Sequence, residues 1–342
     1  MKRLWTIVSS GGVLAALTAV VLFVPTGFVA REPGLTLDLT DPDAPVIRVA
    51  GTDTAASGQI LATSMTQSDQ SVPLTQMVMD FLVPNRDILP ADAVLTPGQT
   101  AAEAREARRA LVLAARDDAV AAGVAQAGYE VAAWPKVLTL RQDGAAAGIL
   151  QPDDLVVAID NVPVGTSNAV REQIRQKQVG DQVLVTVLRA GVTEKLTVDK
   201  LTASTADRAV PTLGVTLWGT GYTYAPEVTA AIDPDRGDPA QGLALAIATY
   251  ERLAGTGTPA GTTIAAVGQV TAAGEVTAVS GINQHAMSAW GAHAGLLLIP
   301  QASCADLTGT FPGLTIAAVT SLDSAVNALS HYPDAAGRLP TC

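Results

Sequence analysis

The stretch GDPAQG (residues 237–242) runs directly into LALAIATYERL (243–253) and fixes the fold class that the sequence predicts. Upstream, VTAAID (228–233) alternates as a strand does, and the Pro, Gly and Asp residues after it are typical of a turn. Downstream, apolar residues recur at the spacing of a helix. Such a turn directs backbone N–H groups and the helix dipole to one point, where an oxyanion can be stabilised. The turn contains no Ser, Thr or Cys, so this oxyanion site would lack a nucleophile.

The segment DPDRGDPAQGL (233–243) resembles the Asp-x-Gly-Gly-Pro-Ser-Ala-Gly segment of Lon-type serine peptidases, specifically the membrane-anchored, PDZ-containing Lon-like proteins of bacteria. On this resemblance the family's nucleophilic serine falls on Ala240. Residues 267–300 resemble the family's hairpin, Gly-Gly-(Ile/Leu)-Lys turn, helix and strand, and the general-base lysine falls on Asn283. The separation of the two positions, 283 − 240 = 43 residues, fits the family register. The surrounding turn then consists of Asp235, Gly237, Asp238, Pro239, Gln241 and Gly242.

Both positions of the catalytic dyad are therefore replaced. A Ser-Lys dyad needs a hydroxyl that attacks the carbonyl and a neutral amine that takes its proton. Ala240 has no heteroatom in its side chain, and the amide of Asn283 does not act as a base. Asp238, where the family has Gly, would place negative charge where the oxyanion develops. The sequence predicts a proteolytically inactive pseudopeptidase that binds peptides or partner proteins. The alternative is an active, ATP-independent serine endopeptidase of the Lon family.

Other side chains near the turn offer a weaker replacement for the dyad. Ser280 and His285 lie close to Asn283 in the sequence, but a Ser-His pair so close together rarely achieves the geometry of a nucleophile and its base. We expect Ser280 to occupy the first Gly position of the family's Gly-Gly turn. We expect His285 to be a surface or partly packed residue. Asp235 either matches the family's acidic position or caps the turn.

The sequence predicts no metal, no cofactor and no nucleic-acid partner. His293 and His331 stand apart and show no metal-ligand spacing. The sequence contains no Walker A motif, so ATP-driven unfolding is not expected. The net charge of −11 opposes binding to phosphates. With 342 residues, 48% of them hydrophobic, the chain can form about two domains.

The N-terminal part of the chain predicts a membrane anchor. Residues 4–30 contain no charged side chain and follow Lys2 and Arg3, and about 20 apolar residues span a bilayer. The positive-inside bias places the N-terminus in the cytoplasm and the bulk of the chain outside it. The expected location is the cell membrane, with a single pass. A cleaved signal peptide is the alternative, but Phe28 fits poorly before the one plausible cleavage point, after Ala30.

Residues 131–203 contain short strands separated by Gly and Asp turns. Their order, with a helix at AVREQIRQK (169–177), resembles a PDZ domain of the bacterial protease-associated type. Such domains add an extended peptide as a strand to a sheet edge and hold its C-terminal carboxylate on backbone N–H groups. A spacer that binds no peptide is the alternative. The resemblance places the peptide-binding turn, opposite the helix that starts at Ala169, at Leu138, Thr139, Leu140 and Arg141.

Strands and helices alternate on both sides of the PDZ-like segment. By their resemblance to Lon-type peptidases, these elements imply an α/β (α+β) Lon-type proteolytic domain with an inserted PDZ domain, preceded by one N-terminal transmembrane helix. The expected parts are residues 1–30 (transmembrane anchor), 31–45 (linker), 46–130 (first part of the Lon-like domain), 131–203 (PDZ domain), 204–330 (second part of the Lon-like domain) and 331–342 (C-terminal tail).

The two cysteines, Cys304 and Cys342, follow the expected anchor and would lie in an oxidising space. We expect them to form a disulfide that ties the last residue back to the domain. Two free or intermolecular thiols are the alternative.

Overall fold

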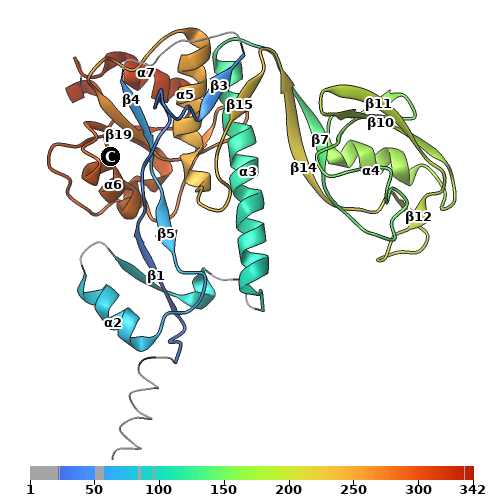
Figure 1. Ribbon diagram of the computed structural model, residues 1–342, viewed down its shortest axis with the longest axis horizontal. Helices are drawn as coiled ribbons and strands as arrows, with labels where there is room; N and C mark the ends of the chain where they lie inside the picture. Colours follow the sequence, from blue (N-terminus) through green and yellow to red (C-terminus); the bar gives the residue numbers. More distant parts are fainter. Residues whose placement is uncertain are drawn as a thin grey trace, which may run out of the picture. The chain divides into compact units, whose positions relative to one another are not determined.

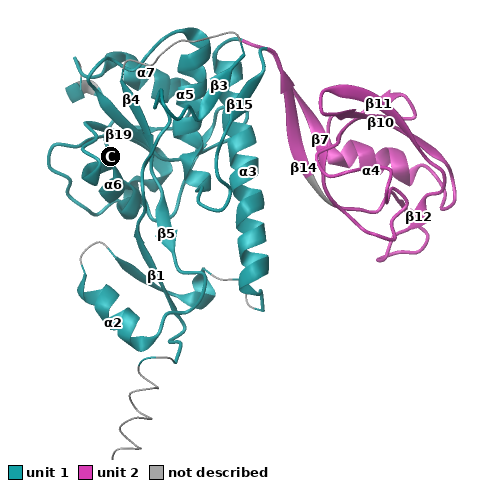
Figure 2. Ribbon diagram, in the orientation of Figure 1, with its two compact units in different colours: residues 1–128, 226–342 teal, residues 129–225 magenta. Residues whose placement is uncertain are grey.

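The computed structural model describes residues 22, 24–50, 58–83, 86–94, 96, 98–334 and 336–342. These residues divide into two compact units (Figure 2). The larger unit consists of the described residues up to Gly128 together with Pro226–Cys342. The smaller unit, Tyr129–Ala225, is inserted in the chain of the larger one.

The larger unit is built on a five-stranded sheet (Figure 1). The strands run in the order β2 (Leu37–Asp38), β4 (Gln59–Ala62), β16 (Thr263–Ala266), β19 (Leu296–Pro300) and β20 (Thr315–Val319). The last four are parallel to one another, and β2 is antiparallel to β4. β19 is buried along its whole length, because helices cover both faces of a parallel sheet.

Four helices enclose this sheet. On one face, α6 buries apolar side chains against β4, β16 and β19. On the other, α5 contacts β4 and β16 and packs against α3 and α7 (Figure 1). Alternate residues of each strand point to opposite faces, so each helix layer receives its own set of apolar side chains. The helices are α3 (Ala101–Gln126), α5 (Gly242–Ala254), α6 (Ile282–Gly291) and α7 (Leu322–His331).

A smaller antiparallel sheet lies at the N-terminal end of the larger unit. β1 (Phe28–Pro33) pairs with β5 (Met65–Gln67) on one side and with β6 (Asp87–Pro90) on the other. α2 (Leu74–Leu82) packs beside β1 and β6. The remaining short elements are β3 (Ile47–Val49), which pairs with β15 (Val228–Ala230), the hairpin of β17 (Gln269–Val270) and β18 (Val276–Thr277), and the 3-10 turns η1 (Ala91–Ala93), η2 (Pro239–Gln241), η3 (Gln301–Asp306) and η4 (Ala336–Arg338).

Two expected boundaries near the N-terminus are wrong. Residues 28–30, assigned to the anchor, and residues 31–33, assigned to the linker, form β1. The strand is held by pairing on both edges, which the local Pro- and Asp-rich composition does not indicate. Most of the expected anchor, residues 4–21 and residue 23, lies outside the described residues. Among the described residues, none of the helices has the length and apolar character needed to cross a membrane.

The smaller unit is an antiparallel sheet with one main helix. Its strands run in the order β11-β10-β8-β7-β14, and α4 packs Val170 and Ile174 into the core beneath them. The bounds are β7 (Val131–Leu140), β8 (Leu155–Ile159), β9 (Val162–Pro163), α4 (Ser167–Arg175), β10 (Val183–Arg189), β11 (Val192–Val198), β12 (Thr202–Ala203), β13 (Pro211–Thr212) and β14 (Val215–Tyr224).

The expected boundary at residue 204 is also wrong. The segment GVTLW was assigned to the second part of the Lon-like domain, but β14 pairs with β7 along nearly its whole length. The smaller unit therefore extends to Ala225. A strand pattern shows that a segment is extended, and its partner is decided by contacts far away in the sequence.

The last residues are packed against the larger unit and do not form a separate tail. Cys304 and Cys342 are joined by a disulfide across a sequence separation of 38 residues. Leu339 is buried, and the carbonyl of Pro340 accepts the N–H of Ala318 in β20 at 2.8 Å. The C-terminal segment thus lies against β20, the edge strand of the main sheet.

Replacing either cysteine with serine should lower the free energy of unfolding by about 3 to 5 kcal/mol, because the cross-link restricts a long loop of the unfolded chain. Urea titration of Cys304→Ser, Cys342→Ser and the double variant measures this. Because the two sulfurs act as one bond, the double variant should lose no more stability than either single variant. Two alkylated thiols in the unfolded, unreduced protein, detected by intact mass, would contradict the pairing.

Candidate functional site

The turn before α5 is held by the side chain of Asp238. One carboxylate oxygen accepts the N–H of Ala240 at 2.9 Å, and the side chain of Gln241 accepts the N–H of Asp238 at 3.2 Å, which completes a capping box. The N–H at position 240 is a group that an oxyanion site would use. In this chain an aspartate already occupies it.

Ala240 is almost fully buried and belongs to the apolar core beneath α6, with Ile282 and Ala286. It also borders a pocket of about 340 Å³. This pocket is the position of the active-site cleft on the Lon-type resemblance. It is lined by Met65, Gln67, Arg108, Asp238, Pro239, Ala240, Gln269, Ala278, Val279 and Ser280.

The structure brings Ser280, and not Asn283, to the pocket beside Ala240. The side-chain amide of Asn283 is fully engaged elsewhere. Its nitrogen donates to the carbonyl of Asp306 at 2.9 Å, and its oxygen accepts the N–H groups of Thr308 and Gly309 at 3.0 and 3.1 Å. Asn283, the position that the Lon-type resemblance assigns to the general base, therefore fixes the loop after η3.

A buried polar cluster, consisting of Thr63, Asp238 and His285, lies behind the pocket. His285 is fully buried, so the expectation of a surface or partly packed residue is wrong. Its Nδ1 lies 3.0 Å from the hydroxyl of Thr63, and its Nε2 lies 3.8 Å from Asp238. Asp238 also accepts the N–H of Met65 at 3.2 Å. Because Thr63 is itself fully buried, its hydroxyl cannot meet a substrate, and the cluster joins the residue that follows β4, and α6, to the turn.

Burial lowers the pKa of His285, and the nearby carboxylate of Asp238 opposes this only in part. The imidazole is therefore neutral near pH 7. The Nε2 atom makes no hydrogen bond with the described residues. This arrangement has the residue types of a catalytic triad but no accessible nucleophile.

Asp235 lies on the surface and pairs with Arg109 of α3 at 3.3 Å. The turn is instead closed by Asp233, whose backbone carbonyl accepts the N–H groups of Arg236 and Gly237. A side chain at Gly237 would lie 2.6 Å from Val112 of α3, so this glycine is required by the close approach of the turn to that helix.

In the smaller unit, the expected peptide-binding edge is already occupied. Thr139 and Leu140 pair with β14, and the N–H of Arg141 donates to the carbonyl of Gly214 at 2.9 Å. The assignment of the carboxylate-binding turn to residues 138–141 is therefore wrong. These residues lie one strand away from the open edge of the sheet.

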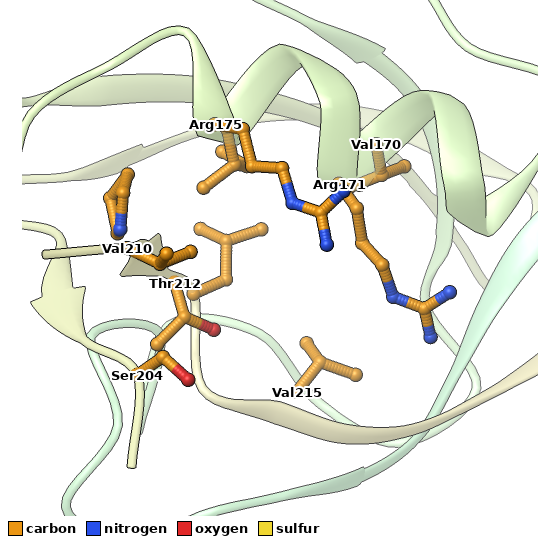
Figure 3. Close-up of a pocket in the computed structure, with 10 residues that line it drawn as sticks. Val170, Arg171, Arg175, Ser204, Val210, Thr212 and Val215 are labelled. Carbon is orange, nitrogen blue, oxygen red and sulfur yellow. The ribbon is translucent and has the colours of Figure 1, made fainter. Parts of the chain in front are cut away.

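A pocket of about 170 Å³ lies instead between α4 and the segment that leads into β14 (Figure 3). Its apolar side is formed by Val170 and Val215, and the guanidinium groups of Arg171 and Arg175 extend into it from α4. The lining residues are Val170, Arg171, Ile174, Arg175, Ser204, Val210, Pro211, Thr212, Leu213 and Val215.

Gly214 lies between Leu213 and Val215, two residues that line this pocket. Its φ of +85° lies in the left-handed region, and an added Cβ would lie 2.6 Å from the Cα of Gly144. The sequence signals that could have located the pocket are the left-handed glycine directly before a strand and the two arginines at i and i+4 on α4. The first signal lies in PTLGV (211–215), which the sequence predicts to belong to the second part of the Lon-like domain.

Comparison with known proteins assigns residues 131–199 to the PDZ domain family. Similar solved structures include the PDZ domain of the SdrC-like protein from Listeria innocua, with 31% identity over 25% of this chain and 92% of that one and a TM-score of 0.23. The corresponding domain from Listeria monocytogenes shows 29% identity over 25% and 86%, with a TM-score of 0.23. A solution structure from Geobacillus thermodenitrificans shows 32% identity over 24% and 92%, with a TM-score of 0.22.

No curated protein matches the chain. The matches described above concern the smaller unit, and the Lon-type resemblance of the larger unit stays a prediction.

Replacing His285 with glutamine should make the larger unit less sensitive to acid. The folded-state pKa of His285 is lowered, so below about pH 6.5 the unfolded chain binds a proton that the folded chain does not, and stability falls as the pH falls. The loss is at most about 1.4 kcal/mol for each pH unit. Urea unfolding at pH 7.5 and pH 5.5 measures it. His331→Gln, at an exposed position, is the control and should keep the wild-type pH dependence. Equal pH dependence in His285→Gln and wild type would contradict the assignment.

Proposed function

Since residues 131–199 form a PDZ domain, we propose that this chain is a membrane-anchored, proteolytically inactive protein that captures the C-terminal ends of peptides or proteins outside the cytoplasm. A PDZ domain indicates peptide or protein binding. The observation that carries the finer proposal is the pocket between α4 and β14, where an apolar wall, two arginines and an open strand edge meet.

The strand edge supports capture of an extended peptide. In the described part of the chain β14 pairs with β7 alone, so it is the edge strand of its sheet. The edge of β14 that faces away from β7 can receive a further strand through main-chain hydrogen bonds. Val215, the first residue of β14, also lines the pocket, so a peptide added along this edge would end in the pocket.

The charges in the pocket support recognition of a terminal carboxylate. Arg175 has no ion pair with the described residues, and Arg171 makes one hydrogen bond, to the side chain of Asn168 at 2.9 Å. Both side chains are exposed and stand over apolar residues. The C-terminus of a peptide whose last residue is apolar would fit this pocket. The apolar side chain would be buried against the apolar wall, and the terminal carboxylate would pair with the arginines.

Peptides with a free C-terminus and an apolar last residue should bind at least 10-fold more tightly than the same peptides with an amidated end, because hydrogen bonds to a charged group are worth about 1.5 to 3 kcal/mol. A peptide array followed by calorimetry on the best sequences measures this. Arg175→Gln should remove most of the difference between free and amidated peptides.

Two matched variants make this test specific. Lys200→Gln removes the same charge from an exposed position outside the pocket and should bind as the wild type does. Arg141→Gln removes a charge that is paired with Asp143 at the turn first expected to bind the carboxylate, and it should also leave binding unchanged. Equal binding of free and amidated peptides would show that the domain does not read a carboxylate.

The proposed lack of proteolysis rests on three features of the larger unit. Ala240 carries no nucleophile, Asn283 is engaged with the loop after η3, and Asp238 occupies the N–H of residue 240. The alternative is an active extracytoplasmic serine endopeptidase. Ser280 favours it, because this exposed hydroxyl lies in the same pocket as Ala240.

A fluorophosphonate probe should not label the unmodified chain. The double variant Ala240→Ser with Asn283→Lys should label at most weakly, because Asp238 keeps negative charge and an accepted N–H where an oxyanion would form. Gel fluorescence after probe treatment measures labelling. Labelling of the unmodified chain that disappears in Ser280→Ala would contradict the proposal and establish the endopeptidase.

A further inference from the structure

The polarity of α2 is the reverse of that expected for a helix packed on a protein core. Its one buried residue is Asp80, whose carboxylate is bound by Gln76 at 3.1 Å and by Arg86. Its large apolar side chains are exposed instead, up to 80% for Phe81 and 69% for Leu82. Leu74, Val78, Phe81 and Leu82 follow the i, i+4, i+7, i+8 spacing of a single helix face. The helix thus turns its carboxylate inward and its apolar face outward.

The start of the described chain adjoins this helix. The backbone at Pro25 forms a bridge with Pro73, and both the N–H and the hydroxyl of Thr26 donate to the carbonyl of Val72, at 3.0 and 2.8 Å. More than half of the exposed large apolar side chains of the described residues fall in these two segments. We call this surface the apolar patch; it consists of Leu22, Val24, Phe28, Leu74, Val78, Met79, Phe81, Leu82 and Val83.

We propose that the apolar patch inserts into the surface of a lipid bilayer, with α2 lying in the plane of the interface beside the point where the anchor enters. This inference rests on the membrane anchor of the proposed function. Residues 4–24, which number 24 − 3 = 21, carry no charge and as a helix would span about 30 Å, the thickness of the hydrocarbon core. A span that ends at residue 24 brings the bilayer surface to the residues that bond to the start of α2.

The lack of positive charge in the apolar patch indicates which class of lipid it would bind. The apolar patch contains no Lys or Arg, Arg86 beside it is paired with Asp80 and Glu32, and the whole chain carries a net charge of −11. Attraction to anionic headgroups therefore contributes little, and burial of apolar side chains among acyl chains drives insertion. The surface fits a bilayer of neutral phospholipids.

A fluorophore on α2 tests this in the full chain. Because Cys304 and Cys342 are bonded to each other, Phe81→Cys supplies the one reactive thiol for an environment-sensitive NBD label. Leu111→Cys, on α3 of the same unit and 61% exposed, is the matched control. Each labelled chain is incorporated into phosphatidylcholine vesicles with and without nitroxide-bearing lipid. The label at position 81 should shift to shorter emission wavelengths and be quenched at least threefold more than the label at position 111.

The outcomes separate this inference from the proposed function. If the unmodified chain does not float with vesicles, the anchor and the inference both fail. If the chain floats but the label at position 81 stays accessible to aqueous iodide and is not quenched by the nitroxide lipid, the inference alone fails. Efficient oxidation of unlabelled Phe81→Cys to a disulfide-linked dimer would assign the patch to a second copy of this chain, which also overturns it.

Discussion

The larger unit depends on the buried carboxylate of Asp238. A buried charge is tolerated only where hydrogen bonds or opposite charges replace the water it has lost. Asp238 meets this requirement by accepting the N–H groups of Met65 and Ala240, and the neutral imidazole of His285 lies 3.8 Å from it. These contacts join β5, the turn before α5, and α6, which are far apart in the sequence. Removing the carboxylate would leave the two backbone donors of Met65 and Ala240 without a partner, so the residue is a structural centre as well as part of the pocket.

The same contacts limit the chemistry of the pocket. A catalytic turn keeps its N–H groups available for the charge that develops during the reaction. Here Asp238 uses the N–H of Ala240, and the carbonyl of Ala240 accepts the N–H of Gly268 at 2.8 Å. The turn has become part of the folded core, with its groups satisfied before any ligand arrives. In the smaller unit the opposite holds, because an open strand edge and the guanidinium of Arg175 remain without partners among the described residues.

Much of the local structure follows from the sequence, because it depends on residues a few positions apart. Thr100 and Glu103 form the capping box that begins α3, and the LLLIP run is a buried strand. The errors concern contacts between distant segments. The strand at 215–224 has the same sequence pattern whichever sheet it joins. Because it pairs with β7, residues 138–141 are not at the open edge of the sheet, and the pocket lies elsewhere. His285 could not be recognised as buried, because its partners Thr63 and Asp238 are 222 and 47 residues away.

In the larger unit, Asp238 and α2 both depart from the rule that charge faces water and apolar side chains face the core, and the departure has a different meaning in each. At Asp238 the buried charge is satisfied by backbone donors, so the violation is repaired within the fold. At α2 the buried charge has partners within the fold, but the exposed apolar face has none among the described residues. Gln76 and Arg86 satisfy the buried carboxylate of Asp80, but nothing in the described residues covers Phe81 and Leu82. A monomer in water gains nothing from exposing such a face, and the free energy of covering it is available only from a partner outside the described chain. The partner of the exposed face of α2 therefore lies outside the described chain, and we propose lipid because an uncharged segment precedes this part of the chain in the sequence.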